Sequence, residues 1–182
     1  MTKEKIIDTQ FLVVVNGPSC AGKSAVADVL VQKYGGIFHA KADVVKWLIS
    51  DYDPPTHWGI VHRLMLALMQ SALAEGLSVV KEGGSYEPEK YVALAGSAQV
   101  PLYIVNVDAP WEVLTTRFEK RIEAKREGAR VANADPARFK QLYDRYHAVK
   151  VDTPLSFDSS TQTPEEIASA IVAYMRKRTI SK

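Results

Sequence analysis

The 182-residue sequence contains a single cysteine, Cys20, so no disulfide bond can form within the chain. Residues 1–10 are polar and lack the apolar core of a signal peptide. No apolar run reaches the roughly 20 residues that a membrane-spanning helix needs. The formal net charge of +2 is too small to indicate a general nucleic-acid or membrane binder. We therefore expect one domain over residues 1–182 in a reducing, cytoplasmic setting, with no membrane partner and an oligomeric state that the sequence leaves open.

A glycine-rich segment at residues 17–24 carries the most specific pattern in the sequence. It reads G-x-x-x-x-G-K-[ST], follows an apolar β-branched run at 11–15 and precedes a helical pattern at 24–33. In such a loop, backbone N–H groups and the helix N-terminus bind a polyphosphate, the lysine reaches its β- and γ-phosphate oxygens, and the serine hydroxyl suits Mg²⁺. The residues expected to bind a nucleoside triphosphate are Gly17, Pro18, Ser19, Cys20, Ala21, Gly22, Lys23, Ser24 and Ala25.

The rest of the chain alternates between short apolar runs and longer amphipathic ones. The pattern predicts strands at 11–15, 37–42, 77–82, 100–107 and 148–151. It predicts helices at 24–33, 44–50, 57–75, 88–95, 110–125, 136–146 and 164–178, the last with Thr163 as its N-cap. This alternation indicates an α/β fold with a parallel sheet covered on both faces. Ligands bind such sheets at the carboxyl ends of the strands, where the glycine-rich loop, Asp43 and Glu82 fall.

The sequence resembles small P-loop kinases of the adenylate-kinase-like superfamily, in particular the chloramphenicol phosphotransferase-like and zeta-toxin-like kinases. The resemblance rests on residues 16–24, on the arginine-rich stretch at 117–130, and on residues 43–46, which are similar to a D-x-x-R element. Lys46 stands where those kinases commonly have arginine. The resemblance implies a P-loop NTPase three-layer α/β/α sandwich with a five-stranded parallel sheet in the order 2-3-1-4-5. It also implies an arginine-rich lid at about 117–135 and ATP with Mg²⁺ as cofactors.

Two carboxylates at strand ends are candidates for the reacting site. Asp43 would orient an acceptor hydroxyl and take its proton, as an aspartate does in the resembling kinases, and the alternative is a helix N-cap. Glu82 would bind Mg²⁺ or its waters, although the resembling kinases usually have aspartate there. The alternative for Glu82 is a solvated strand-end charge or a partner for Lys81 or Lys41.

The expected lid contains four candidate catalytic arginines: Arg117, Arg121, Arg126 and Arg130. The first two lie one turn apart and should share a helix face, from which their guanidinium groups would stabilise charge on the transferring phosphoryl group. Glutamates alternate with these arginines, so an ordinary solvated helix is the alternative. By resemblance, the loop at 153–159, with Thr153 at its start, would lie beside the adenine of ATP.

Aromatic and histidine side chains fall where the roof of an acceptor pocket is expected, and ordinary packing is the alternative: Trp47, Tyr52, His57, Trp58 and His62. The chain lacks the N-K-x-D and D-x-x-G motifs of GTPases and the L-S-G-G-Q signature of ABC ATPases. We therefore expect an ATP-dependent kinase that transfers the γ-phosphate to a hydroxyl group of a small molecule. One alternative is a nucleoside, nucleotide or nucleic-acid 5′-end acceptor, with Lys46 and Arg63 as candidate cationic groups, although the charge does not favour nucleic acid. A second is a regulatory module that binds nucleotide without catalysis.

Overall fold

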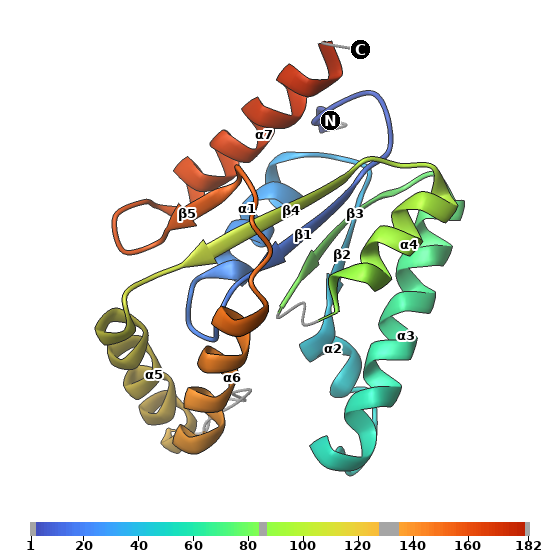
Figure 1. The fold of residues 1–182 in the computed structure, drawn as a ribbon. Helices are drawn as coiled ribbons and strands as arrows, with labels where there is room; N and C mark the ends of the chain where they lie inside the picture. Colours follow the sequence, from blue (N-terminus) through green and yellow to red (C-terminus); the bar gives the residue numbers. More distant parts are fainter. Residues whose placement is uncertain (1–2, 84–86, 128–134, 181–182) are drawn as a thin grey trace.

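The computed structural model describes residues 3–83, 87–127 and 135–180. In these ranges the strands are β1 (Leu12–Asn16), β2 (Ile37–Lys41), β3 (Ser78–Glu82), β4 (Leu102–Asp108) and β5 (Ser156–Asp158). They form one parallel sheet in the order β2-β3-β1-β4-β5 (Figure 1), which confirms the predicted order. The first strand is therefore central, and the loop that follows it lies at the middle of the carboxyl edge.

The helices of the described residues cover both faces of this sheet. They are α1 (Lys23–Lys33), α2 (Ala42–Lys46), α3 (Pro54–Ala74), α4 (Pro88–Ala98), α5 (Trp111–Arg126), α6 (Pro136–Val149) and α7 (Pro164–Ile180). α1 and α7 pack on one face and α3 and α4 on the other, while α5 and α6 lie beyond the carboxyl end of the sheet (Figure 1). The predicted three-layer α/β/α arrangement is confirmed. Within the described ranges, every helix is too short or too polar to span a bilayer.

The central strand β1 explains the two-sided core. Val13 and Val15 belong to the cluster of buried residues shared with α1 and α7. Leu12 and Val14 belong to the opposite cluster, which contains residues of α3 and α4. Because neighbouring residues of a strand point to opposite faces, a strand covered on both sides must be apolar at every position.

The C-terminal third differs from the prediction at the fifth strand. Residues 148–151 were predicted as that strand, but α6 runs to Val149 and a loop follows, so the prediction was wrong. Beyond Tyr146, the His147 ring lies 4.3 Å from the Tyr143 ring, one turn earlier in the helix, and its Nε2 lies 3.6 Å from Oδ2 of Asp108 in β4. The fifth strand is instead β5, a short edge strand in which Phe157 packs against the core.

Two helix starts bear on the predictions. The predicted N-cap of α7 is confirmed, because the Thr163 hydroxyl accepts a hydrogen bond from the Glu166 N–H at 3.2 Å and the Glu166 carboxylate accepts one from the Thr163 N–H at 2.8 Å. In α2, by contrast, Lys41 holds the N-cap position and Asp43 lies inside the first turn. The N-cap alternative for Asp43 was therefore wrong.

Candidate nucleotide and acceptor site

The glycine-rich loop between β1 and α1 requires glycine at both ends. A Cβ atom on Gly17 would lie 2.0 Å from the carbonyl oxygen of Val107, which no side chain could tolerate. Gly22 caps α1 in the left-handed conformation, with φ of 88°. The first turn of α1 contains no acidic residue, so the positive end of the helix dipole is not offset there. The loop has the backbone form and the charge that a bound phosphate requires.

The ammonium group of Lys23 lies over this loop and donates a hydrogen bond to the Pro18 carbonyl oxygen at 2.5 Å. Burial lowers the pKa of Lys23 from 10.5 to about 8, against the opposing effect of the Glu82 charge. The group therefore stays mostly protonated at neutral pH. A phosphate anion would favour its charged form further, which fits the predicted role of Lys23.

The Ser24 hydroxyl and the Glu82 carboxyl group lie together beside the loop. Ser24 donates a hydrogen bond to Glu82, and burial raises the pKa of Glu82. Glu82 is 9% exposed, so it is not the solvated strand-end charge of the alternative interpretation. Lys41, an alternative partner for Glu82, instead donates a hydrogen bond to Asp28 at 2.6 Å.

The second oxygen of Glu82, Oε2, is buried and has no hydrogen-bond partner among the described residues. It lies 3.9 Å from Nε2 of His39, too far for a hydrogen bond. Burial and the charge of Lys41 lower the pKa of His39 from 6.5 to about 4, so the ring is neutral at pH 7. A hydroxyl oxygen beside an orphaned carboxylate oxygen suits Mg²⁺, which prefers oxygen ligands and retains several waters. The described residues contain no group of three or more His, Cys, Asp or Glu side chains that could hold a metal ion alone.

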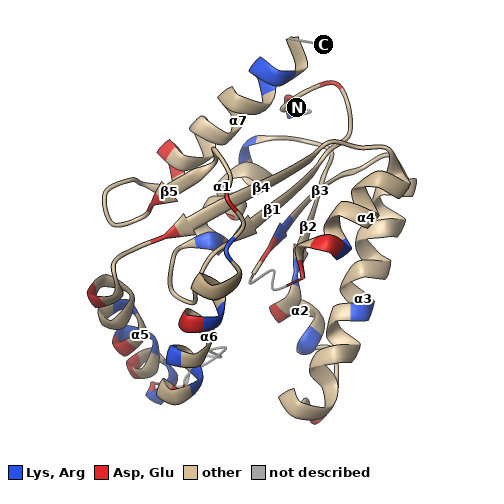
Figure 2. Ribbon diagram, viewed as in Figure 1, with Lys and Arg blue, Asp and Glu red and all other residues tan. Residues whose placement is uncertain are grey.

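Two of the four predicted arginines reach the loop from α5. Arg117 donates hydrogen bonds to the Cys20 carbonyl oxygen at 3.3 Å and to the Ser159 carbonyl oxygen at 2.7 Å. Arg121 donates one to the Ser19 hydroxyl at 3.1 Å. The two therefore share a helix face, although charges of both signs alternate along α5 (Figure 2).

The other two arginines lie farther along the predicted lid. Arg126 is the last residue of α5 and is exposed. Arg130 lies outside the described residues. The base of the segment is held by aromatic stacking, because the Phe139 ring of α6 lies 4.2 Å from Phe118 and 5.1 Å from Trp111. α5 thus presents Arg117 and Arg121 to the loop from a packed base.

The segment beside the loop on the α5 side is the connection between β5 and α7. A pocket opens there, with Ser159, Gln162 and Arg117 among its lining residues. Thr153, the predicted adenine neighbour, lies before β5, and its hydroxyl donates a hydrogen bond to the Ile104 carbonyl oxygen at 2.8 Å. Ser159 therefore lies beside the glycine-rich loop. Thr153, by contrast, connects the segment before β5 to β4 through its hydrogen bond.

Asp43 lies at the carboxyl end of β2, in the first turn of α2. Its side chain is 57% exposed, and Oδ1 lies 2.7 Å from the buried Lys46 ammonium group. Burial raises the pKa of Tyr52, and the Asp43 charge adds to that shift; at Lys23 the same charge opposes the lowering of the pKa by burial. Lys46 stands where the resembling kinases commonly have arginine. It contacts one oxygen of the Asp43 carboxylate, and the side chain as a whole stays partly exposed to solvent.

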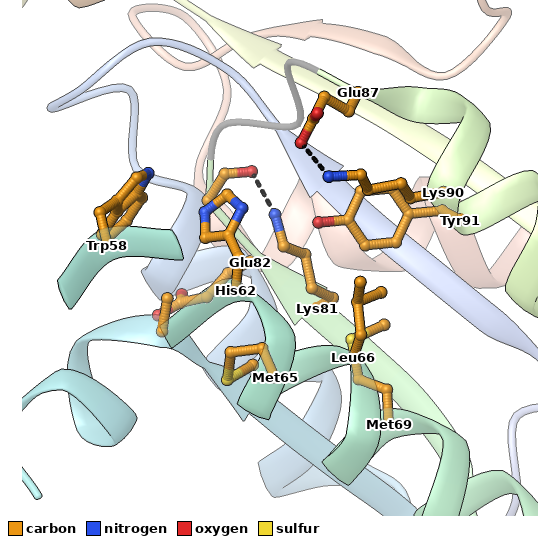
Figure 3. A pocket seen from close by; sticks show the side chains of 12 residues that line it. Trp58, His62, Met65, Leu66, Met69, Lys81, Glu82, Glu87, Lys90 and Tyr91 are labelled. Atoms are coloured by element: carbon orange, nitrogen blue, oxygen red, sulfur yellow. Dashed lines mark hydrogen bonds and ion pairs between the residues drawn. The ribbon is translucent and has the colours of Figure 1, made fainter. Parts of the chain in front are cut away.

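A second pocket opens on the α3 and α4 side of the sheet (Figure 3). Trp58 and His62 line it from α3, Lys81 from β3 and Tyr91 from α4. The other three members of the predicted aromatic roof, Trp47, Tyr52 and His57, do not line this pocket and instead contact one another. Lys81, considered from the sequence only as a partner for Glu82, lines this pocket.

Comparison with known proteins agrees with this architecture. A family model described as an AAA domain matches residues 12–146. No curated protein matches the chain significantly. A Chloroflexus aurantiacus protein provisionally assigned as a kinase is 19% identical, with a TM-score of 0.70 over 93% of this chain and 98% of its own. Shikimate kinase from Aquifex aeolicus is 16% identical, with a TM-score of 0.59 over 94% of this chain and 100% of its own. A chain of the Pnkp1/Rnl/Hen1 RNA repair complex is 14% identical, with a TM-score of 0.63 over 85% of this chain and 51% of its own.

Proposed function

Because the chain belongs to the AAA domain family and has the fold of small P-loop kinases, we propose that it is an ATP- and Mg²⁺-dependent kinase. Its acceptor is a hydroxyl group of a small molecule. The observation that carries this proposal is the placement of Asp43, a partly open carboxylate at the carboxyl end of β2, on the same edge of the parallel sheet as the glycine-rich loop. A carboxylate in that position can act as a base for an acceptor hydroxyl.

On the donor side, the loop amides and Lys23 hold the β- and γ-phosphates. Ser24 and Glu82 would hold Mg²⁺, which supplies positive charge to neutralise phosphate oxygens. The pocket beside Ser159 and Gln162 is the candidate position for the adenine. Arg121, which reaches the loop at Ser19, is placed to stabilise charge on the transferring group.

On the acceptor side, Asp43 orients the hydroxyl and takes its proton as the oxygen attacks the γ-phosphorus. The new bond joins the acceptor oxygen to the γ-phosphorus. The bond between the γ-phosphorus and the bridging oxygen breaks, and ADP leaves with the electron pair. The Lys46 ammonium group, 2.7 Å from Oδ1, holds the Asp43 side chain in place.

The test compares Asp43→Asn with wild type in a screen of hydroxylated metabolites incubated with ATP and Mg²⁺. Phosphorylated products are detected by mass spectrometry, and ATP affinity is measured by calorimetry. We expect Asp43→Asn to bind ATP normally and to transfer phosphate about 10²- to 10⁴-fold more slowly. Asp51→Asn is the matched control: it makes the same chemical change in a left-handed backbone conformation, with φ of 51°, that asparagine tolerates well. Unchanged transfer by Asp43→Asn would remove Asp43 from the reaction.

A nucleic-acid 5′-hydroxyl group is the second candidate acceptor, favoured by the similarity to a chain of an RNA repair complex. Adding an oligonucleotide with a 5′-hydroxyl end and a set of nucleoside monophosphates to the same screen separates the two. Transfer to either of these in preference to small hydroxylated metabolites would replace the first proposal. Normal ATP binding with no transfer to any acceptor would favour a regulatory module.

A further inference from the structure

The pocket between α3 and α4 adjoins the groups proposed to act in phosphate transfer. Ala42, which directly precedes Asp43, and Glu82, which accepts a hydrogen bond from Ser24, both line it. β2 and β3 are neighbouring parallel strands, with Lys41 opposite Glu82, so the pocket begins at the carboxyl ends of these two strands. A molecule bound in the pocket would therefore lie beside the segment that carries the candidate base.

Apolar and aromatic side chains form a continuous part of the pocket wall. Met65, Leu66 and Met69 contribute from α3, Trp58 stands on one side and Tyr91 comes from α4 (Figure 3). Methionine side chains are flexible and polarisable, so they adapt to apolar ligands of different shape and make favourable contacts with aromatic rings. This part of the wall suits the apolar body of a small molecule.

Trp58 leaves part of its ring open to solvent at the side of the pocket. The residue is 38% exposed, and the centre of its ring lies 4.6 Å from that of His62, one turn later on α3. A large aromatic ring at the edge of a pocket gains from being covered, because its apolar surface then leaves water. A ligand with an apolar or planar body would cover Trp58 as it enters the pocket.

The charged side chains that line the pocket already interact within the protein. Lys81 donates a hydrogen bond to the Gly83 carbonyl oxygen at 3.0 Å, and Lys90 pairs with Glu87 at 2.6 Å (Figure 3). A ligand with many hydroxyl groups would have to replace these interactions or leave some of its own hydroxyl groups without partners, and both cost free energy. A ligand with one reacting hydroxyl group avoids that cost.

We propose that the acceptor is an alcohol whose hydroxyl group is attached to an apolar or aromatic body, and that this body occupies the pocket between α3 and α4. The inference rests on the proposed kinase function. The body packs against Trp58, Met65 and Met69, and the hydroxyl group faces Asp43. The acceptor oxygen gains the γ-phosphoryl group and loses its proton to Asp43, and ADP leaves.

The experiment compares two sets of primary alcohols as acceptors with ATP and Mg²⁺. The apolar set contains benzyl alcohol, phenylethanol and cyclohexylmethanol, and the polar set contains glycerol, gluconate and glucose. Cyclohexylmethanol and glucose form a matched pair, because each has a hydroxymethyl group on a six-membered ring and only the ring substituents differ in polarity. We expect kcat/KM for the best apolar alcohol to exceed that for the best polyol by about 100-fold or more.

Leu66→Ala and Leu64→Ala make the same change two positions apart on α3. Leu66 lines the pocket, whereas Leu64 is 45% exposed and is not among the described residues that line it. We expect Leu66→Ala to raise KM for the preferred alcohol by about 10-fold and to change kcat much less, because it removes apolar contacts to the ligand body. Leu64→Ala should change KM by less than about twofold.

Trp58→Ala provides a second variant, because the partly exposed ring can be removed without opening the core. It should raise KM for the same alcohol by about 10-fold or more, and melting temperatures verify that all three variants are folded. Preferred transfer to polyols, or KM values of Leu66→Ala and Trp58→Ala equal to that of wild type, overturns the inference and leaves the kinase proposal standing. ATP binding without transfer to any compound overturns the kinase proposal, and this inference with it.

Discussion

The proposed donor side and the proposed acceptor side each contain a buried lysine, but the two lysines are placed in different ways. Lys23 belongs to a contiguous motif, donates a hydrogen bond to Pro18 only five residues away and lies at the start of a helix. Lys81 lies on a strand and faces a pocket whose other walls come from α3 and α4. The donor side is thus defined by local backbone geometry, and the acceptor side by how distant elements pack.

The residues around the two lysines also differ, since those near Lys23 are polar and hydrogen-bonded and those near Lys81 are mostly apolar. On the donor side, Arg117 and Arg121 form hydrogen bonds that hold the loop against α5 and the β5–α7 connection. On the proposed acceptor side, α3 carries Arg63 as its only lysine, arginine or acidic residue (Figure 2). It also leaves Leu64 and Leu68 exposed. A preorganised donor site suits a common cofactor. The apolar residues of α3 can change during evolution to fit different acceptors without altering the donor site.

The largest expected effect comes from Gly17→Ala, which places a methyl group against the Val107 carbonyl oxygen, 2.0 Å away. The loop must shift, so we expect ATP affinity to fall by at least about 100-fold and the free energy of unfolding by about 2–4 kcal/mol. Fluorescent ATP titration and chemical denaturation measure the two quantities. Gly96→Ala is the control, because its Cβ meets no atom within 4 Å inside α4, and it should stabilise the protein by about 0.5–1 kcal/mol. Normal ATP binding by Gly17→Ala would show that the loop is not preorganised.

Lys23→Met and Lys81→Met sharpen the comparison of the two sides, because each removes one buried ammonium group and keeps the side-chain volume. Lys23→Met should weaken ATP binding by about 30- to 100-fold, since it removes a charged contact to phosphate. Lys81→Met should change ATP affinity by less than about twofold. Both affinities are measured by calorimetry at pH 7 with Mg²⁺. Equal losses in the two variants would mean that the sides do not act separately.

A pH-dependent effect on stability is expected at His39, which lies beside Asp28 and Glu82 and whose pKa is lowered by burial and by the charge of Lys41. The folded-state pKa of His39 is about 4, against 6.5 for an ordinary histidine, so the unfolded chain binds more protons between these values. Stability should therefore fall as the pH drops from 6.5 towards 4, by about 2–3 kcal/mol in all. Urea denaturation of His39→Gln at pH 7.5, 5.5 and 4.5 should show a shallower decline than wild type. An identical decline in the variant would contradict this account.

The elements predicted correctly are those with strong local signals. The sheet order was implied by the resemblance to P-loop kinases, while strands such as β1, which is buried along its whole length, were visible as apolar runs. The start of α7 was visible as a threonine followed three residues later by glutamate. β5 was missed because it is a three-residue edge strand with one apolar side chain. The prediction instead chose residues 148–151, which contain the β-branched residues Val149 and Val151. The extension of α6 to Val149 brings His147 beside Asp108 at the end of β4, a contact between distant segments that no local pattern indicates.

The sequence alone determined the donor loop, because two glycines, a lysine and a serine at set spacing dictate backbone angles within a few residues. Only the tertiary structure decided which side chains meet that loop: Arg117 reaches Cys20 across 97 positions of the chain. It also decided that Lys81 is buried in a pocket and that Asp43 pairs with Lys46 while remaining partly open. The physical reason is that burial and charge environment depend on contacts between distant segments, which short-range patterns do not contain.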